Sequence, residues 1–195
     1  MKVYHISETL RLGDDMNPDF QNLRELALPF VQALEKSEDC YYSMILNGKY
    51  LRAVLGKFNF WEWSDYCKWA VEGAFEFIRK TEFPHCCSRL KCNYFYDDLE
   101  NSMALYQFDW GGESPEIQEK IHLLEIELED DAPQKFDMNI FDEAYNAMCE
   151  NSDSETVLNC ARRYFSGEST SSPVLEIMSD KPAKATKDLT NLLKK

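Results

Sequence analysis

Positive charge is scarce in this sequence. Lys and Arg number 21 against 35 Asp and Glu, which gives a formal net charge of −14. Proteins that bind nucleic acids through the phosphate backbone need clustered Lys and Arg. We therefore expect no direct binding of that kind, and the simplest role of the acidic surface is solubility.

Long apolar runs are missing as well. No segment approaches the roughly 20 apolar residues that a membrane-spanning helix needs. After Lys2, charged residues return at Glu8 and Arg11, before an apolar run of the length found in secretory leaders can form. These absences predict a cytoplasmic protein that does not use a membrane.

The cysteines follow no recognisable spacing. Seven cysteines stand at positions 40, 67, 86, 87, 92, 149 and 160. An odd number without regular spacing predicts reduced thiols rather than a disulfide framework. The group formed by His85, Cys86, Cys87 and Cys92 has neither the CxxC pattern nor the second ligand pair of a structural zinc site. We expect buried thiols there and no bound metal.

Apolar and aromatic residues are plentiful, and charge is unevenly distributed. Hydrophobic residues make up 44% of the 195 residues, with 12 Phe, 10 Tyr and 4 Trp, enough for one sizeable core. Residues 181–195 hold five Lys and one Asp, a net charge of +4, so the first 180 residues carry −18 of the total. We predict a single domain over residues 1–180 and a Lys-rich tail over 181–195.

Hydrophobic spacing places helices in the first half of the chain and most strands in the second. Apolar residues at helical spacing predict helices over 18–37 and 60–83, with Pro29 kinking or dividing the first. Asn47-Gly48 predicts a turn within a short helical segment. Later segments alternate between strand and helix. Strands are expected at 88–98, 120–130 and 173–179, and helices at 99–108, 137–150 and 154–165. This order predicts an α+β fold with a mostly antiparallel or mixed sheet.

Two polar residues stand out within expected strands. In the opening strand, alternation places Val3, His5 and Ser7 on one face. Glu176 lies between Leu175 and Ile177 in an apolar strand, where an ionised carboxylate must reach solvent or a partner. A structural histidine and a surface glutamate at a sheet edge are the ordinary alternatives.

Three segments together resemble a known superfamily. They are "VYHIS" with His5, "NYFYDDLENSMALY" with Tyr94 and Tyr106, and "YFSGESTSSPVLEI" with Glu176. Their order resembles the His-Tyr-Glu branch of the ADP-ribosyltransferase-like superfamily, which contains diphtheria toxin and the poly-ADP-ribose polymerases. The stretch from "FEFIRKTEF" to "HCCSRL" resembles small bacterial or viral members. This resemblance implies a split sheet and NAD as a substrate.

The resemblance also implies roles for individual residues. His5 would bind a ribose hydroxyl of NAD, and the backbone near Ile6 with Ser7 would hold the nicotinamide amide. Tyr94 and Tyr106 would offer aromatic faces to the nicotinamide ring. Further roles follow for two charged residues. Glu176 would stabilise the oxocarbenium-like charge, and Arg89 would contact the pyrophosphate or form a structural ion pair.

The implied activity is transfer of ADP-ribose from NAD to a macromolecular acceptor, in the first place a protein, or hydrolysis of NAD. Val174 stands where arginine-directed transferases carry the first Glu of a Glu-x-Glu pair, so arginine is disfavoured as the acceptor. Two non-catalytic roles remain open: an acidic binding or inhibitor protein that imitates nucleic acid, and an inactive member of the same fold.

Overall fold

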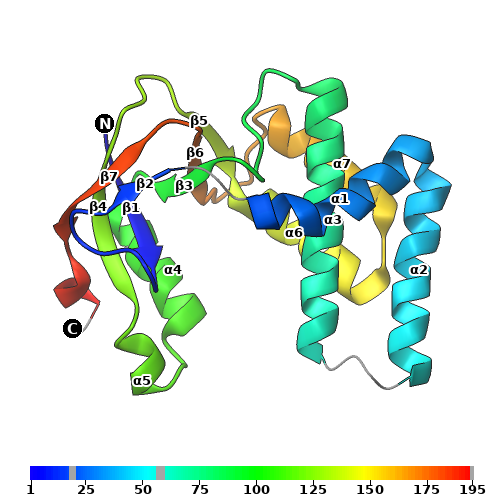
Figure 1. Ribbon diagram of the computed structural model, residues 1–195, viewed down its shortest axis with the longest axis horizontal. Helices are drawn as coiled ribbons and strands as arrows, with labels where there is room; N and C mark the ends of the chain where they lie inside the picture. Colours follow the sequence, from blue (N-terminus) through cyan, green and yellow to red (C-terminus); the bar gives the residue numbers. More distant parts are fainter. Residues whose placement is uncertain (18–20, 56–59, 194–195) are drawn as a thin grey trace. The chain divides into compact units, whose positions relative to one another are not determined.

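A computed structural model describes residues 1–17, 21–55 and 60–193 (Figure 1). The chain forms two compact units. Unit 1 comprises residues 1–19, 92–135 and 174–195, and unit 2 comprises 20–91 and 136–173. Each unit is built from segments far apart in the sequence, so composition along the chain shows no boundary between them.

Unit 1 contains an antiparallel sheet, as the strand-rich second half of the sequence predicted. The sheet has seven strands in the order β2-β7-β4-β1-β3-β6-β5. The strands are β1 (Lys2–Ser7), β2 (Asp15–Met16), β3 (Asn93–Tyr96), β4 (His122–Leu128), β5 (Gln134–Asp137), β6 (Leu175–Ser179) and β7 (Ala183–Asp188). β5 crosses the boundary between the units. β1, predicted at the N-terminus, lies inside the sheet between β4 and β3.

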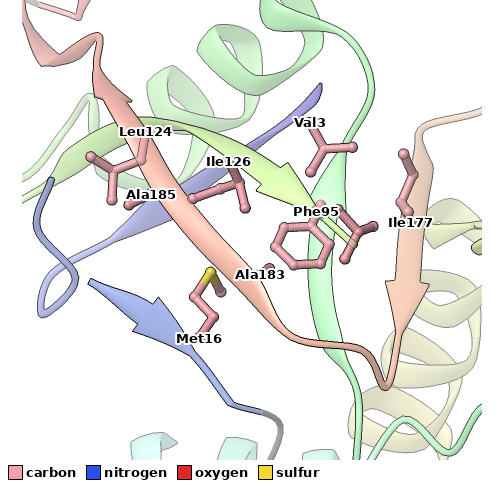
Figure 2. Packing of buried hydrophobic residues seen from close by; sticks show 9 residues of the cluster. Val3, Met16, Phe95, Leu124, Ile126, Ile177, Ala183 and Ala185 are labelled. Atoms are coloured by element: carbon pink, nitrogen blue, oxygen red, sulfur yellow. The ribbon is translucent and has the colours of Figure 1, made fainter. Parts of the chain in front are cut away.

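One face of this sheet carries an apolar cluster (Figure 2). Alternation brings Val3, Leu124 and Ile126 to this face, where they pack with Phe95 and Ile177 from the neighbouring strands. The rest of the buried cluster consists of Met16, Leu128, Ala183 and Ala185. The cluster thus joins the first, middle and last segments of the chain.

A helix packs against the strands that carry the candidate residues. α4 (Leu99–Trp110) begins at Asp98, whose carboxylate accepts the N–H groups of Glu100 and Asn101. It packs against β1 and β3, with Ser102 and Tyr106 buried. Neither residue belongs to the cluster in Figure 2. A short helix, α5 (Pro115–Gln118), and a final 3-10 turn, η1 (Thr190–Leu192), complete unit 1.

Unit 2 is helical, and aromatic rings fill its interior. Its helices are α1 (Gln21–Lys36), α2 (Glu38–Leu55), α3 (Phe60–Glu82), α6 (Met138–Asn151) and α7 (Ser154–Phe165). The ring of Phe75 meets those of Phe141 and Tyr164 at centroid distances of 5.1 and 5.3 Å. Such edge-to-face contacts add to the hydrophobic stabilisation of the core. Asp137 caps α6, because its carboxylate accepts the N–H of Asn139.

Several local expectations change in the structure. Asn47-Gly48 lies inside α2 rather than in a turn, and at Pro29, where a kink or a division was expected, α1 is not divided. The strand expected over 88–98 is confined to β3. Part of the predicted C-terminal tail is β7, which pairs with β4 from Ala183 to Asp188 and fills an interior position in the sheet. Among the described residues no helix is long and apolar enough to cross a membrane.

Candidate functional site

The three strands that carry the candidate residues are neighbours in the sheet. The order β1-β3-β6 brings the strands of His5, Tyr94 and Glu176 side by side, although their positions in the sequence span most of the chain. The order of these residues along the chain can be read from the sequence, whereas strand pairing brings their strands together in the sheet. All three belong to unit 1.

His5 is fixed by its neighbour strand. Its Nδ1 lies 2.8 Å from the main-chain oxygen of Tyr94, and its ring meets the edge of Phe95 at a centroid distance of 6.1 Å. A carbonyl oxygen only accepts hydrogen bonds, so Nδ1 carries the proton and Nε2 is left as an acceptor in the neutral ring. Burial lowers the pKa of His5 below its ordinary value of 6.5, although the bond to Tyr94 acts in the opposite direction. His5 is therefore neutral at physiological pH.

The ladder between β1 and β3 is short. β1 pairs with β4 along its whole length, from Lys2 to Ser7, but its recorded pairing with β3 is confined to Tyr4 and Tyr96. The main chain of Met1 exchanges two hydrogen bonds with Leu128 of the β4 segment, so alternation turns the N–H and C=O of Ile6 toward β3. Beside this position, the carbonyl oxygen of Tyr94 accepts a hydrogen bond from the His5 ring. The β1–β3 ladder is thus much shorter than the β1–β4 ladder.

Glu176 is buried among tyrosine-bearing positions. Glu176 is 3% exposed and lies directly opposite Tyr96 of β3. Tyr96 in turn lies opposite Tyr4 of β1. Directly paired residues share a face of the sheet, so these three residues form one row. Glu176 has further interactions in the structure.

The register corrects the expectation that His5 and Glu176 face one cleft together. His5 lies on the face of Phe95 and Ile177, whereas Glu176 lies on the opposite face with Tyr96. The physical reason is the two-residue period of the strand, which sends neighbouring positions to opposite faces. No single face of the ladder therefore presents both side chains.

The tyrosines are partly as expected. Tyr94 is half-buried and lies opposite Met178, on the face that carries Glu176. Tyr106 is 6% exposed on α4, and its ring stacks on Trp110 at 6.1 Å. Sequence reasoning missed Tyr96, although its spacing of two from Tyr94 placed both on one face.

Ser7 stabilises a turn at the end of β1. Its Oγ accepts the N–H groups of Thr9 and Leu10 at 3.2 and 3.1 Å. Across the ladder it faces His122 of β4. The Ser7 hydroxyl also lies 3.4 Å from the Thr9 hydroxyl, and either oxygen can donate in that contact.

Arg89 is a structural residue, which corrects its assignment to a pyrophosphate. It belongs to unit 2 and is 8% exposed. Its guanidinium donates to both carboxylate oxygens of Glu72 at 3.1 and 3.2 Å and to the Tyr164 hydroxyl at 2.7 Å, and it lies 4.1 Å from the ring of Phe141. A buried guanidinium held in this way satisfies its charge within the core. The alternative considered from the sequence, an ion pair, is the one present.

No metal centre appears in the described part of the chain. Within residues 1–17, 21–55 and 60–193, no three His, Cys, Asp or Glu side chains come together as a metal site would require. All seven cysteines are free thiols.

Comparison with known proteins places the chain in a family. A family profile described as a protein of unknown function, DUF2441, matches residues 3–191. The chain belongs to the DUF2441 family. The match covers both units and β7, so the family unit is the whole two-part fold and extends beyond residue 180. A search of curated proteins finds no significant match.

Proposed function

We propose that this protein binds NAD where β1 and β3 separate and transfers the ADP-ribose group of NAD to a macromolecular acceptor. A protein is the acceptor that we favour. The observation that carries the proposal is the adjacency of β1, β3 and β6, with His5 held by the Tyr94 carbonyl and Glu176 opposite Tyr96. The short β1–β3 ladder supports it, because a split sheet is what the superfamily resemblance implies.

Each residue has a role that its surroundings permit. Nε2 of the neutral His5 accepts a hydrogen bond from a ribose hydroxyl, because Nδ1 is committed to Tyr94. The main chain of Ile6, aided by Ser7, binds the nicotinamide amide along the open side of β1. The rings of Tyr94, Tyr96 and Tyr106 attract the positively charged nicotinamide.

Glu176 acts on the reacting centre. Cleavage of the bond between C1′ and nicotinamide leaves the electron pair on the nicotinamide nitrogen and positive charge on the ribose. The Glu176 carboxylate stabilises that charge by a hydrogen bond to the neighbouring ribose hydroxyl. The acceptor then forms the new bond to C1′ and loses its proton, and water in place of the acceptor gives NAD hydrolysis.

A non-catalytic role is the second candidate, and the register favours it. Because His5 and Glu176 lie on opposite faces of the ladder, both residues are also consistent with structural use in an inactive member of the same fold. An acidic binding protein that imitates nucleic acid remains a variant of this candidate, supported by the net charge of −14.

Labelled NAD discriminates between the candidates. We expect wild-type protein to release nicotinamide and Glu176→Gln to release it at least about 100-fold more slowly, as when one transition-state contact is removed. Glu125→Gln is the matched control, because Glu125 lies in the same row opposite Tyr4 but pairs with Lys2 at 2.8 Å. Equal rates in wild type and Glu176→Gln would exclude the role of Glu176. Absence of both NAD binding and nicotinamide release from wild-type protein would reject the enzyme proposal in favour of the non-catalytic one.

A further inference from the structure

One helix of unit 2 exposes a row of large apolar side chains. Tyr42, Leu46 and Tyr50 of α2 are 46%, 41% and 63% exposed. Their spacing of four places them along one face, while Tyr41 and Ile45 point into the core and are fully buried. We call Tyr42, Leu46 and Tyr50 the α2 stripe. Exposed apolar rows of this kind are typical of interaction surfaces.

A hollow lies beside the α2 stripe. It has a volume of about 500 Å³ and is lined by Asp39, Cys40, Ser43, Met44, Asn47, Gly48 and Tyr66. Tyr66 of α3 donates to the Met44 carbonyl at 2.8 Å, and a Cβ at Gly48 would lie 2.7 Å from the Tyr66 ring. Glycine at position 48 therefore lets α3 approach α2 closely at the floor of the hollow. On the helix, Asp39 and Ser43 stand between the hollow and the stripe.

We propose that the α2 stripe is the contact surface for a second copy of this chain. The two α2 helices would pack antiparallel about a two-fold axis at Leu46, which brings the same patch of each copy into contact. In that arrangement Tyr50 of each copy enters the gap formed by Asp39, Ser43 and Leu46 of the other, next to the hollow. A protruding ring beside a recess makes the surface complementary to itself, and tyrosine is among the residues that dominate interface energies.

The charges on α2 support the antiparallel arrangement. Glu38 and Asp39 lie at the beginning of the helix, and Lys49 lies near the far end of the stripe. Antiparallel packing places Lys49 of one copy level with Ser43 of the other, about one helical turn from Asp39 and within reach of a lysine side chain. Parallel packing would instead place like charges together. The Tyr50 hydroxyl would also reach the Asp39 carboxylate, so the polar rim of the recess gains a partner.

Sedimentation of the full chain tests the proposal. We expect a concentration-dependent dimer in the micromolar range, and we expect Leu46→Asp to weaken association by about tenfold or more, with an unchanged circular dichroism spectrum. Ile117→Asp is the matched control, because Ile117 is also an exposed apolar residue, 36% exposed, but lies on α5 in unit 1. Charge reversal adds a second readout: Asp39→Lys weakens the dimer, and Asp39→Lys combined with Lys49→Asp restores it.

Crosslinking locates the axis. In a Cys40→Ser background, Leu46→Cys should form an intermolecular disulfide under mild oxidation, because the two sulfurs would meet at the two-fold axis. Ile117→Cys in the same background should not. A monomer at all concentrations up to hundreds of micromolar would overturn the proposal, as would a dimer that Leu46→Asp does not weaken.

Discussion

The imidazole of His5 donates from Nδ1 to the main-chain oxygen of Tyr94 across 2.8 Å. This bond joins the side chain of one strand to the backbone of its neighbour, at a point just beyond the recorded ladder between them. It holds the ring in one tautomer. The availability of Nε2 as an acceptor follows from this contact, whereas the neutral state of the ring follows from its burial.

The lowered pKa of His5 predicts a pH dependence of stability. The unfolded chain takes up a proton near the ordinary value of 6.5, whereas the folded protein resists protonation until the pH falls further. The contribution of His5 is therefore fully present above about pH 6.5 and is lost as the pH falls below it. Urea denaturation of wild type and His5→Asn should be compared between about pH 7.5 and 5, roughly the titration range of histidine. As the pH falls, the unfolding free energy should decrease less in the variant than in wild type. His85 and His122 are retained in both proteins, so an identical loss in both would contradict the assignment.

The Arg89–Glu72 pair predicts a large loss when one partner is removed. Arg89→Ala leaves the Glu72 carboxylate buried without its counter-charge, and we expect unfolding free energy to fall by about 3–5 kcal/mol. Replacing both with Glu72→Leu and Arg89→Met should recover most of that loss. Arg162→Ala is the control, because its pair with Glu82 has side chains 41% and 38% exposed and should contribute less than about 1 kcal/mol. Chemical denaturation measures all four proteins.

The interior position of β7 predicts sensitivity at its buried residues. Ala185 is 1% exposed in the cluster of Figure 2, so Ala185→Asp places an unpaired charge in the core and should destabilise unit 1 by several kcal/mol. Thr186 is the next residue on the same strand and is exposed. Thr186→Asp should change stability by less than about 1 kcal/mol. Hydrogen exchange of β4 amides reports the difference, and equal protection in both variants would show that this segment is a loosely held tail.

Gly73 predicts a steric effect in the helical unit. A Cβ at position 73 would lie 2.5 Å from the Cβ of Phe30 and 3.0 Å from the carbonyl oxygen of Ala27, where neither α1 nor α3 can yield easily. Gly73→Ala should therefore cost about 1–3 kcal/mol despite the helix preference of alanine. Gly112 has no atom within 4 Å of a built Cβ, so Gly112→Ala should have little effect on the melting temperature. A neutral or stabilising Gly73→Ala would show that the two helices are loosely packed.

Helices with strong periodicity were predictable because their pattern is local. α3, α6 and α7 correspond to segments whose apolar residues recur at helical spacing. β4 and β6 follow from alternation and apolar content in the same way. No turn forms at Asn47-Gly48, because the close contact with Tyr66 favours a glycine inside the helix. This packing outweighs the local preference of glycine for turns.

The sequence by itself determined the α+β class, most helix positions and the two unusual strand residues, His5 and Glu176. Tertiary structure decided that β1, β3 and β6 are neighbours, that β7 enters the sheet and that Arg89 belongs to Glu72. It also decided that His5 and Glu176 occupy opposite faces of the ladder. Helical and strand periodicity depend on residues a few positions apart, whereas pairing, register and burial of charge depend on segments that only folding brings together.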